Sequence, residues 1–212
     1  AGTDDGNIQL SRDNGYTWEK LNASAPAAPA GKKAKAVPAD TRLQTNSLWV
    51  SRVIASQHKE GRVYVTLNGY RSDNFGAYLY MSDDYGKTWK QLGKDLPAEP
   101  LNVIREDPKS DSILYVGSDG GLYVSFDQGN SFMIWNGGMP RSVPVHDIAI
   151  QVRENEIILG THGRSLYVSK LDDIQQLRKD PNWMKSRMEK QKRNLAPNAN
   201  VDDDDANPGH GE

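Results

Sequence analysis

The sequence predicts an all-β protein built as a β-propeller of four-stranded blades, and three observations lead to this fold class. A phrase of the type SDDYGKTWKQL occurs three times, at 11–21, 82–92 and 125–135. The second and third copies begin at Ser82 and Ser125, a spacing close to the ~40–45 residues of one propeller blade. Between the copies, short runs rich in Val, Ile, Leu and Tyr alternate with turn residues, as expected for strands.

The repeated phrase has the pattern Ser-x-Asp-x-Gly-x-Thr/Ser-aromatic, which we call the box. Its glycine suits a tight turn that requires a positive φ. Its aspartate is expected to accept backbone N–H groups of the turn, and its aromatic residue to fill the space between neighbouring sheets. We interpret the boxes as structural braces. Their members are Ser11, Asp13, Gly15 and Trp18; Ser82, Asp84, Gly86 and Trp89; and Ser125, Asp127, Gly129 and Phe132.

The blades follow one another in residues 1–174. The first blade contributes only its last two strands, and the second and third are complete. The fourth has three strands and no recognisable fourth strand, which gives about three and a quarter blades. Closed propellers typically have ~4–8 blades. We therefore expect the chain to be the C-terminal part of a longer protein, with the remaining blades supplied by its N-terminal part or by another chain.

Three segments interrupt or follow this pattern. Residues 22–47 form an Ala/Pro/Lys-rich insert that we expect to be flexible. Residues 175–196 predict a helical extension, with Asp180 as N-cap and Pro181 at the first helical position. Residues 197–212 contain four consecutive aspartates and no core-forming residues, which predicts a disordered acidic tail.

Composition excludes several classes of function. The net charge of −2 gives no electrostatic bias toward nucleic acid. No stretch approaches the ~18 apolar residues of a transmembrane helix. The chain has no cysteine and hence no thiol chemistry, and no His, Asp or Glu cluster has the spacing of metal ligands. We expect no cofactor and no metal.

The three boxes resemble the Asp-box, or BNR-repeat, propellers, which include sialidases, xyloglucan hydrolases and sortilin/Vps10 receptors. The phrase GTHGRSLYV at 160–168, followed by LDDI, resembles the last blade of bacterial sortilin-like proteins that are often labelled glycosyl hydrolases. This resemblance implies a non-catalytic bacterial protein outside the cytoplasm (periplasmic, at the cell surface or secreted) that binds a peptide, protein or glycan.

Two alternatives stay open. The first is a sialidase- or xyloglucanase-like glycoside hydrolase whose catalytic carboxylates lie partly outside this chain. The sequence lacks the Arg-Ile-Pro phrase of sialidases, and nothing in it selects the pair of carboxylates that glycoside hydrolysis requires. We therefore assign no catalytic residue. The second alternative is a scaffold subunit of a surface complex.

Blade geometry suggests where a ligand would bind. The boxes lie at the turns between the third and fourth strands, whereas the turns between the second and third strands lie on the opposite face. Extra length gathers on that second face, as at a functional surface. The candidate ligand-binding residues there are Tyr70, Arg71, Asp119, His162 and Arg164. His146 and Asp147, at the start of an innermost strand, are interpreted as structural.

Overall fold

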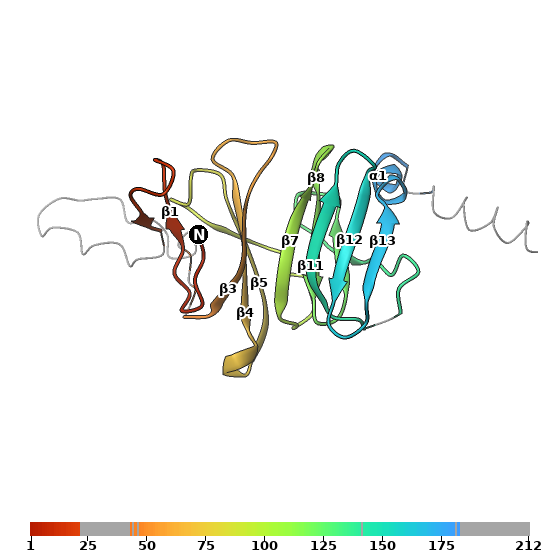
Figure 1. Ribbon diagram of the computed structural model, residues 1–212, viewed down its shortest axis with the longest axis horizontal. Coiled ribbons are helices and arrows are strands. Elements are labelled where there is room, and N and C mark those ends of the chain that lie inside the picture. Colours follow the sequence, from red (N-terminus) through yellow and green to blue (C-terminus); the bar gives the residue numbers. More distant parts are fainter. Residues whose placement is uncertain (22–42, 44, 46, 141, 181, 183–212) are drawn as a thin grey trace, which may run out of the picture. The chain divides into compact units, whose positions relative to one another are not determined.

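The computed structural model describes residues 1–21, 43, 45, 47–140, 142–180 and 182, and within them the predicted all-β class is confirmed (Figure 1). Residues 1–171 form one compact unit and residues 172–212 a second. The strands are β1 (Gln9–Leu10), β2 (Glu19–Lys20), β3 (Trp49–Ala55), β4 (Val63–Gly69), β5 (Asn74–Ser82), β6 (Lys90–Leu92), β7 (Leu101–Asp107), β8 (Ser110–Ser118), β9 (Leu122–Ser125), β10 (Met133–Ile134), β11 (Val145–Gln151), β12 (Glu156–Thr161) and β13 (Leu166–Lys170).

These strands make four antiparallel sheets that follow the order of the chain. Sheet one is β1-β2, sheet two β3-β4-β5-β6, sheet three β7-β8-β9-β10 and sheet four β11-β12-β13. Each strand pairs with its neighbours in the sequence, so that every sheet is a simple meander. The four strands predicted for blades two and three, and the three predicted for blade four, are all present.

The first strands of sheets two, three and four share a β-bulge, an extra residue with no partner on the second strand. The bulge residues are Ser51, Asn102 and His146. In each sheet, the residue before the bulge pairs with a residue near the end of the second strand. The next residue along the chain is Asn68 in sheet two, Asp119 in sheet three and His162 in sheet four. We call these three the turn residues, because each leads into the turn after the second strand.

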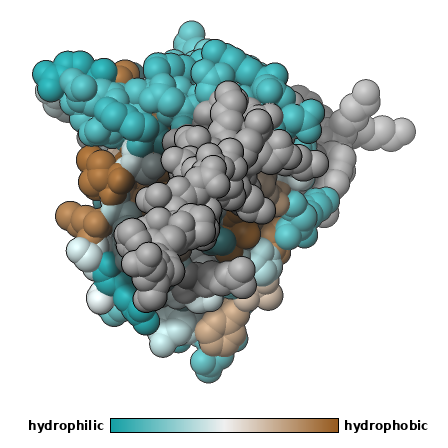
Figure 2. All heavy atoms as spheres, turned by 90° about the vertical axis from the view of Figure 1, so that its right-hand side faces the viewer, coloured by the Kyte–Doolittle hydropathy of each residue, from teal (hydrophilic) through white to brown (hydrophobic). Residues whose placement is uncertain are grey.

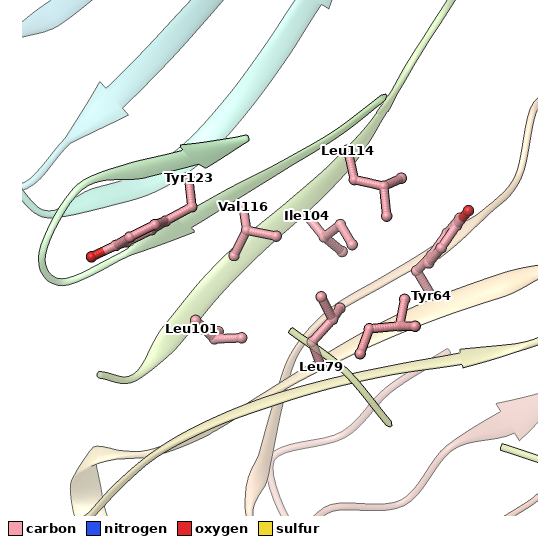
Figure 3. Packing of buried hydrophobic residues seen from close by; sticks show 8 residues of the cluster. Tyr64, Leu79, Leu101, Ile104, Leu114, Val116 and Tyr123 are labelled. Atoms are coloured by element: carbon pink, nitrogen blue, oxygen red, sulfur yellow. The ribbon is translucent and has the colours of Figure 1, made fainter. Parts of the chain in front are cut away.

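The main hydrophobic core lies between sheets two and three. Tyr64 and Leu79 of sheet two meet Ile104, Leu114 and Val116 of sheet three (Figure 3). The Tyr64 hydroxyl donates a hydrogen bond of 3.2 Å to Glu106 Oε1, and burial raises the tyrosine pKa. Removal of this apolar surface from water is the main force that joins the two sheets.

A second core joins sheets one and two, and it includes a residue that we had placed in the flexible insert. Leu43 is buried there with Ile8, Val50 and Trp89. Thr45 is also buried. Leu43 and Thr45 of segment 22–47 therefore belong to the folded unit, because both side chains are buried in it. Residues 22–42, 44 and 46 lie outside the described part of the chain.

All three boxes share the hydrogen bonds made by their Ser, Asp, Gly and Thr/Ser residues. In the third, Gly129 N donates to Ser125 Oγ at 2.8 Å, and Ser131 N and Oγ donate to the two Asp127 oxygens at 2.9 and 2.7 Å. The glycines at this position have φ of 94°, 84° and 83°, which only glycine adopts without strain. Hydrogen bonds from the side chain and backbone of Thr17 lower the pKa of Asp13 to about 2.

The aromatic residues of the boxes differ in burial. Trp89 is 4% exposed and packs in the core between sheets one and two. Phe132 is partly buried against the main core. Trp18 is 51% exposed, although its Nε1 donates to Gly15 O just as Trp89 Nε1 donates to Gly86 O. The expectation that Trp18 fills a space between sheets is therefore not met within the described residues, since no described sheet covers its ring.

The structure contains a helix that the sequence did not indicate, α1 (Asp172–Lys179), which ends before the predicted N-cap Asp180. Asp172 and Asp173 in the first turn, with Arg178 and Lys179 in the last, favour the helix dipole at both ends. The helix predicted after Asp180 within the extension 175–196, and the predicted acidic tail at 197–212, lie outside the described residues. No helix in the described part of the chain is long and apolar enough to cross a membrane.

Candidate functional site

A cavity of about 410 Å³ opens on the face opposite the boxes. It is formed where the first strands of sheets two, three and four begin and where the turns after their second strands converge. Its position follows from the meander, which brings these strand ends to one face of the unit. The lining residues are Trp49, Asn68, Tyr70, Arg71, Asn102, Asp119, Pro144, His146 and His162.

Four of the five predicted ligand-binding residues line this cavity. Tyr70 and Arg71 come from the turn between β4 and β5, Asp119 from the turn between β8 and β9, and His162 follows β12. Arg164 is exposed and lies outside the lining.

His146, which we interpreted as structural, also lines the cavity. It is the bulge residue of β11, and the bulge leaves it without a partner on β12. Its side chain is half exposed. The neighbouring Asp147 turns to the inner strands instead, where its Oδ1 accepts a hydrogen bond of 2.6 Å from Arg52 Nη2.

Two buried asparagines form the floor of the cavity. Asn68 Nδ2 donates to Asn102 Oδ1 at 2.9 Å, and Asn102 Nδ2 donates to Asp119 Oδ1 at 2.9 Å and to Val145 O at 3.3 Å. The amide of Tyr70 donates to Asn68 Oδ1. These bonds tie three sheets together and fix the direction of the Asp119 carboxylate.

Sequence reasoning missed Trp49, Asn68, Asn102 and Pro144. A signal for Asn68 was present, because Asn68, Asp119 and His162 are each followed by a glycine at the end of a second strand. Aligning the blades on that glycine would have grouped all three turn residues. The bulge that brings Asn102 into the cavity has no comparable sequence signature.

One wall of the cavity is aromatic. The guanidinium of Arg71 lies 5.2 Å from the ring centroid of Trp49, within the range of a cation–π interaction. Tyr70 meets Phe75 edge to face, with ring centroids 6.1 Å apart. The 3-10 turn η2 (Tyr70–Ser72), which Asp73 ends in the left-handed region, presents Tyr70 and Arg71. Of the two rings that line the cavity, Tyr70 is 62% exposed and Trp49 is 38% exposed, so both keep surface for stacking.

The opposite wall carries two imidazoles. The rings of His146 and His162 lie 5.2 Å apart and are inclined by 31°. His146 Nε2 is 3.9 Å from Asp119 Oδ1. The backbone amide of His162 donates to Pro144 O at 3.1 Å and so holds the turn against the start of β11.

These walls favour a polar ligand with some apolar surface. Aromatic faces can stack against C–H groups, while Arg71, the imidazoles and Asp119 can exchange hydrogen bonds with hydroxyl or amide groups. Asp119 is the one carboxylate among the lining residues. The lining therefore does not provide the two carboxylates that glycoside hydrolysis uses. Among the described residues, no three His, Cys, Asp or Glu side chains are arranged to hold a metal ion.

A charged cluster lies on the inner strands of the same three sheets. Asp147 Oδ1 is 2.6 Å from Arg52 Nη2 and 3.7 Å from Arg105 Nη2. Arg105 Nε also donates to Ile148 O. Burial and the nearby Arg52 charge lower the pKa of Arg105. These two ion pairs join β3, β7 and β11, the inner strands that carry the cavity.

Comparisons with known proteins agree with the repeat and the fold. A family model described as "BNR/Asp-box repeat" matches residues 9–20 and 80–91, which contain most of the first two boxes. The third box shows the same hydrogen bonds. No curated protein sequence matches the chain significantly.

Solved structures similar to the chain include two GH74 enzymes. The enzyme from Niastella koreensis matches with a TM-score of 0.53 and 16% identity over 76% of this chain and 24% of that one. The GH74 xyloglucanase from Xanthomonas campestris matches with a TM-score of 0.52 and 18% identity. The match covers 82% of this chain and 26% of that one. YCF48 from Cyanidioschyzon merolae matches with a TM-score of 0.48 and 12% identity. The match covers 81% of this chain and 63% of that one.

The chain has the fold of a partial β-propeller with Asp-box repeats. Sheets two and three are complete four-stranded blades, and the sequential antiparallel sheets agree with the propeller likeness of the GH74 structures. At these identities the likeness establishes the fold alone. The chain spans about a quarter of the length of the two GH74 structures.

Proposed function

We propose that this β-propeller segment is a non-catalytic binding module, and that the cavity on the face opposite the boxes binds a carbohydrate. The single observation that carries the proposal is the composition of the lining: exposed Trp49 and Tyr70 rings beside Arg71, two imidazoles and one oriented carboxylate. Sugar rings offer C–H faces for stacking and hydroxyl groups for hydrogen bonds, and this lining can satisfy both.

The fixed floor supports the same proposal. Because Asn68, Asn102 and Asp119 are bonded to one another, the free protein already holds the polar groups in place. A preformed site loses little conformational entropy when its ligand binds. Peptide binding is the nearest alternative within this class, and a location outside the cytoplasm and a sortilin-like identity remain predictions of the sequence.

A second candidate function is glycoside hydrolysis. It is favoured by the likeness to two GH74 enzymes, one of them titled a xyloglucanase. In that case Asp119 would be one of two catalytic carboxylates, with the second on a part of the propeller outside this chain. A scaffold role is favoured by no specific observation among the described residues.

Titration calorimetry with xyloglucan, β-glucan and sialylated oligosaccharides would test the proposal. We expect Trp49→Ala to weaken carbohydrate binding by about tenfold or more, equivalent to ~1.4 kcal/mol. Arg71→Ala should weaken it as well. Arg164→Ala is the matched control. This substitution removes the same charge as Arg71→Ala but outside the cavity, so it should leave the affinity unchanged.

Two results would overturn the proposal. One is the absence of binding to every glycan in the panel while an unrelated peptide library yields a ligand sensitive to Trp49→Ala. The other is turnover of xyloglucan or an aryl glycoside that Asp119→Asn abolishes, because that would make the site catalytic.

A further inference from the structure

The tetrapeptide Leu-Tyr-Val-Ser occurs twice at the same blade position with opposite burial. In β9, Leu122 is 1% exposed and Val124 is fully buried, whereas Leu166 and Val168 of β13 are 67% and 61% exposed. The register is the same, since Leu122 pairs with Gly117 and Leu166 with Gly160. Sequence and local structure are thus equal, and the difference in burial reflects what covers each strand.

Sheet four covers β9. Strand β11 contacts β7 and β8, and Leu122 shares a cavity of about 230 Å³ with Ile157, Leu159 and Tyr167 of sheet four. The same relation holds one blade earlier, where Leu79 of β5 is buried against Leu114 and Val116 of sheet three (Figure 3). Each blade therefore buries its third strand under the next blade.

Polar contacts between blades follow an equally regular rule. The bulge residue donates to a carbonyl at the start of the next inner strand: Ser51 Oγ to Leu101 O at 2.7 Å, and Asn102 Nδ2 to Val145 O at 3.3 Å. The turn residue meets the next bulge residue: Asn68 bonds to Asn102, and Asp119 Oδ1 lies 3.9 Å from His146 Nε2.

Sheet four has the same three features with which sheets two and three contact the next blade. His146 is its bulge residue, His162 its turn residue, and Leu166 and Val168 are its exposed third-strand side chains. Figure 2 looks toward the β13 side of the molecule and shows hydrophobic surface among polar residues there. An apolar face of this kind is costly to leave in water, and in repeat architectures it is buried by the neighbouring repeat.

We propose that the face of sheet four formed by His162, Leu166 and Val168 binds a further propeller blade. The occupant is a blade of the same kind as sheet four, because sheet four already fits an identical Leu-Tyr-Val-Ser strand in β9. The bulge residue of the additional blade lies against His162, just as His146 of sheet four lies against Asp119 of sheet three. The new blade thereby adds a wall to the cavity beside His162. The interface stands independently of which ligand the cavity binds.

A tandem duplication supplies the missing occupant. Residues 1–168 are joined to a second copy of residues 125–212, so that Ser125 takes the place of Ser169, gives the fourth blade a box and lets a copy of sheet four follow it. A second variant joins residue 168 to residue 82, so that a copy of sheet three follows instead. Both retain residues 1–168 of the original unit and use equivalent serines as the junction.

The readout is thiol labelling in this cysteine-free chain. Leu166→Cys in the first copy should react as fast as the exposed reference Lys87→Cys in the parent protein, and about tenfold or more slowly in a tandem variant, because a covered site reacts only when it opens. Lys87→Cys should not change. Leu159→Lys in the added copy of sheet four should restore the labelling rate of the first tandem variant.

Other results would overturn the proposal. Unchanged labelling of Leu166→Cys in both tandem variants means that a blade does not fit this face. Slow labelling in the parent itself means that another occupant is already present. Sedimentation would then identify it as a second copy, if the parent is a dimer, or as residues of the same chain, if it is a monomer. Protection that survives Leu159→Lys would also contradict the proposed contact.

Discussion

Asn68 and Asn102 join two blades through one buried amide-to-amide hydrogen bond, in which Asn68 Nδ2 lies 2.9 Å from Asn102 Oδ1. Asn102 Nδ2 also donates to Asp119 Oδ1 of its own blade and to Val145 O of the next blade. A buried polar group that loses its partner retains its desolvation cost. This pair therefore couples the stability of the propeller to the shape of the cavity floor.

Replacing Asn102 with alanine should destabilise the protein and loosen the cavity together. We expect a loss of about 1–3 kcal/mol in the free energy of unfolding, because Asn68 Nδ2 and Asp119 Oδ1 each lose a buried partner. Urea denaturation followed by circular dichroism measures this loss. Gln91→Ala, at an exposed position of β6, is the control and should change stability by less than about 0.5 kcal/mol. Equal effects of both substitutions would contradict the structural role of Asn102.

The box aspartates should make the fold sensitive to acid. Burial disfavours the charge on Asp127, but hydrogen bonds from Ser131 and Ser125 outweigh it and lower the pKa. A carboxyl group with a lowered pKa in the folded state stabilises the protein above its unfolded pKa of ~3.9, and this stabilisation is lost as the pH falls toward the folded value. For Asp13, that value is about 2.

The matching measurement is the melting temperature of wild type and of Asp127→Asn between pH 7 and pH 2. The difference between the two should be largest near neutral pH, where the charge-assisted bonds of this exposed carboxylate are worth about 1 kcal/mol once solvent screening is allowed for. It should shrink as the pH falls below ~4. Asp4→Asn, which alters an exposed carboxylate outside the three boxes, serves as control. A difference that does not depend on pH would show that the charge of Asp127 is not what stabilises the turn.

Deprotonation of buried tyrosines should also limit stability in alkali. Burial and the nearby Glu99 raise the pKa of Tyr123 to about 12. The unfolded chain releases this proton near pH ~10, so the stabilisation is complete below that pH and is lost as the pH rises toward 12. Tyr123→Phe should flatten the decline of the unfolding free energy between pH 9 and 11.5. An equally steep decline in the variant would assign the alkaline transition to other groups, such as Tyr64 and Tyr115.

The sequence was sufficient to predict the blades because each blade repeats the same local chemistry. The box specifies a turn through short-range hydrogen bonds, and the Leu-Tyr-Val-Ser and Leu-Tyr-Met-Ser runs specify the strand before it. Such local features can be read without knowledge of the rest of the chain. α1 was missed because only Leu171 separates the end of β13 at Lys170 from Asp172, and no Gly, Pro, Asn or Ser marks the change from strand to helix.

The cavity could be predicted only in part. Tyr70, Arg71, Asp119 and His162 lie in turns whose face follows from the meander, so topology alone brings them together. Asn102 and His146 reach the same cavity through bulges, which shift a side chain from the sheet to its rim. A bulge depends on the register between two strands, and the sequence of one strand does not state that register.

Trp18 and Trp89 offer a direct test of how neighbouring blades contribute to stability. Both occupy the aromatic position of a box and make the same bond to a glycine carbonyl, yet Trp89 is 4% exposed and Trp18 is 51% exposed. We expect Trp89→Ala to cost about 3–5 kcal/mol, as for a large buried aromatic residue, and Trp18→Ala to cost much less. Chemical denaturation of the two variants measures both losses.

The comparison also separates two contributions to stability: the hydrogen bonds within the box, and the burial of its aromatic ring under a neighbouring blade. If the hydrogen bonds of the box alone stabilised the fold, both substitutions would have similar effects, since the bonds lost are the same. A small effect of Trp18→Ala that rises toward that of Trp89→Ala once a preceding blade is supplied would assign the difference to burial between blades. Equal and large losses in the present chain would instead show that Trp18 is covered by residues outside the described ranges.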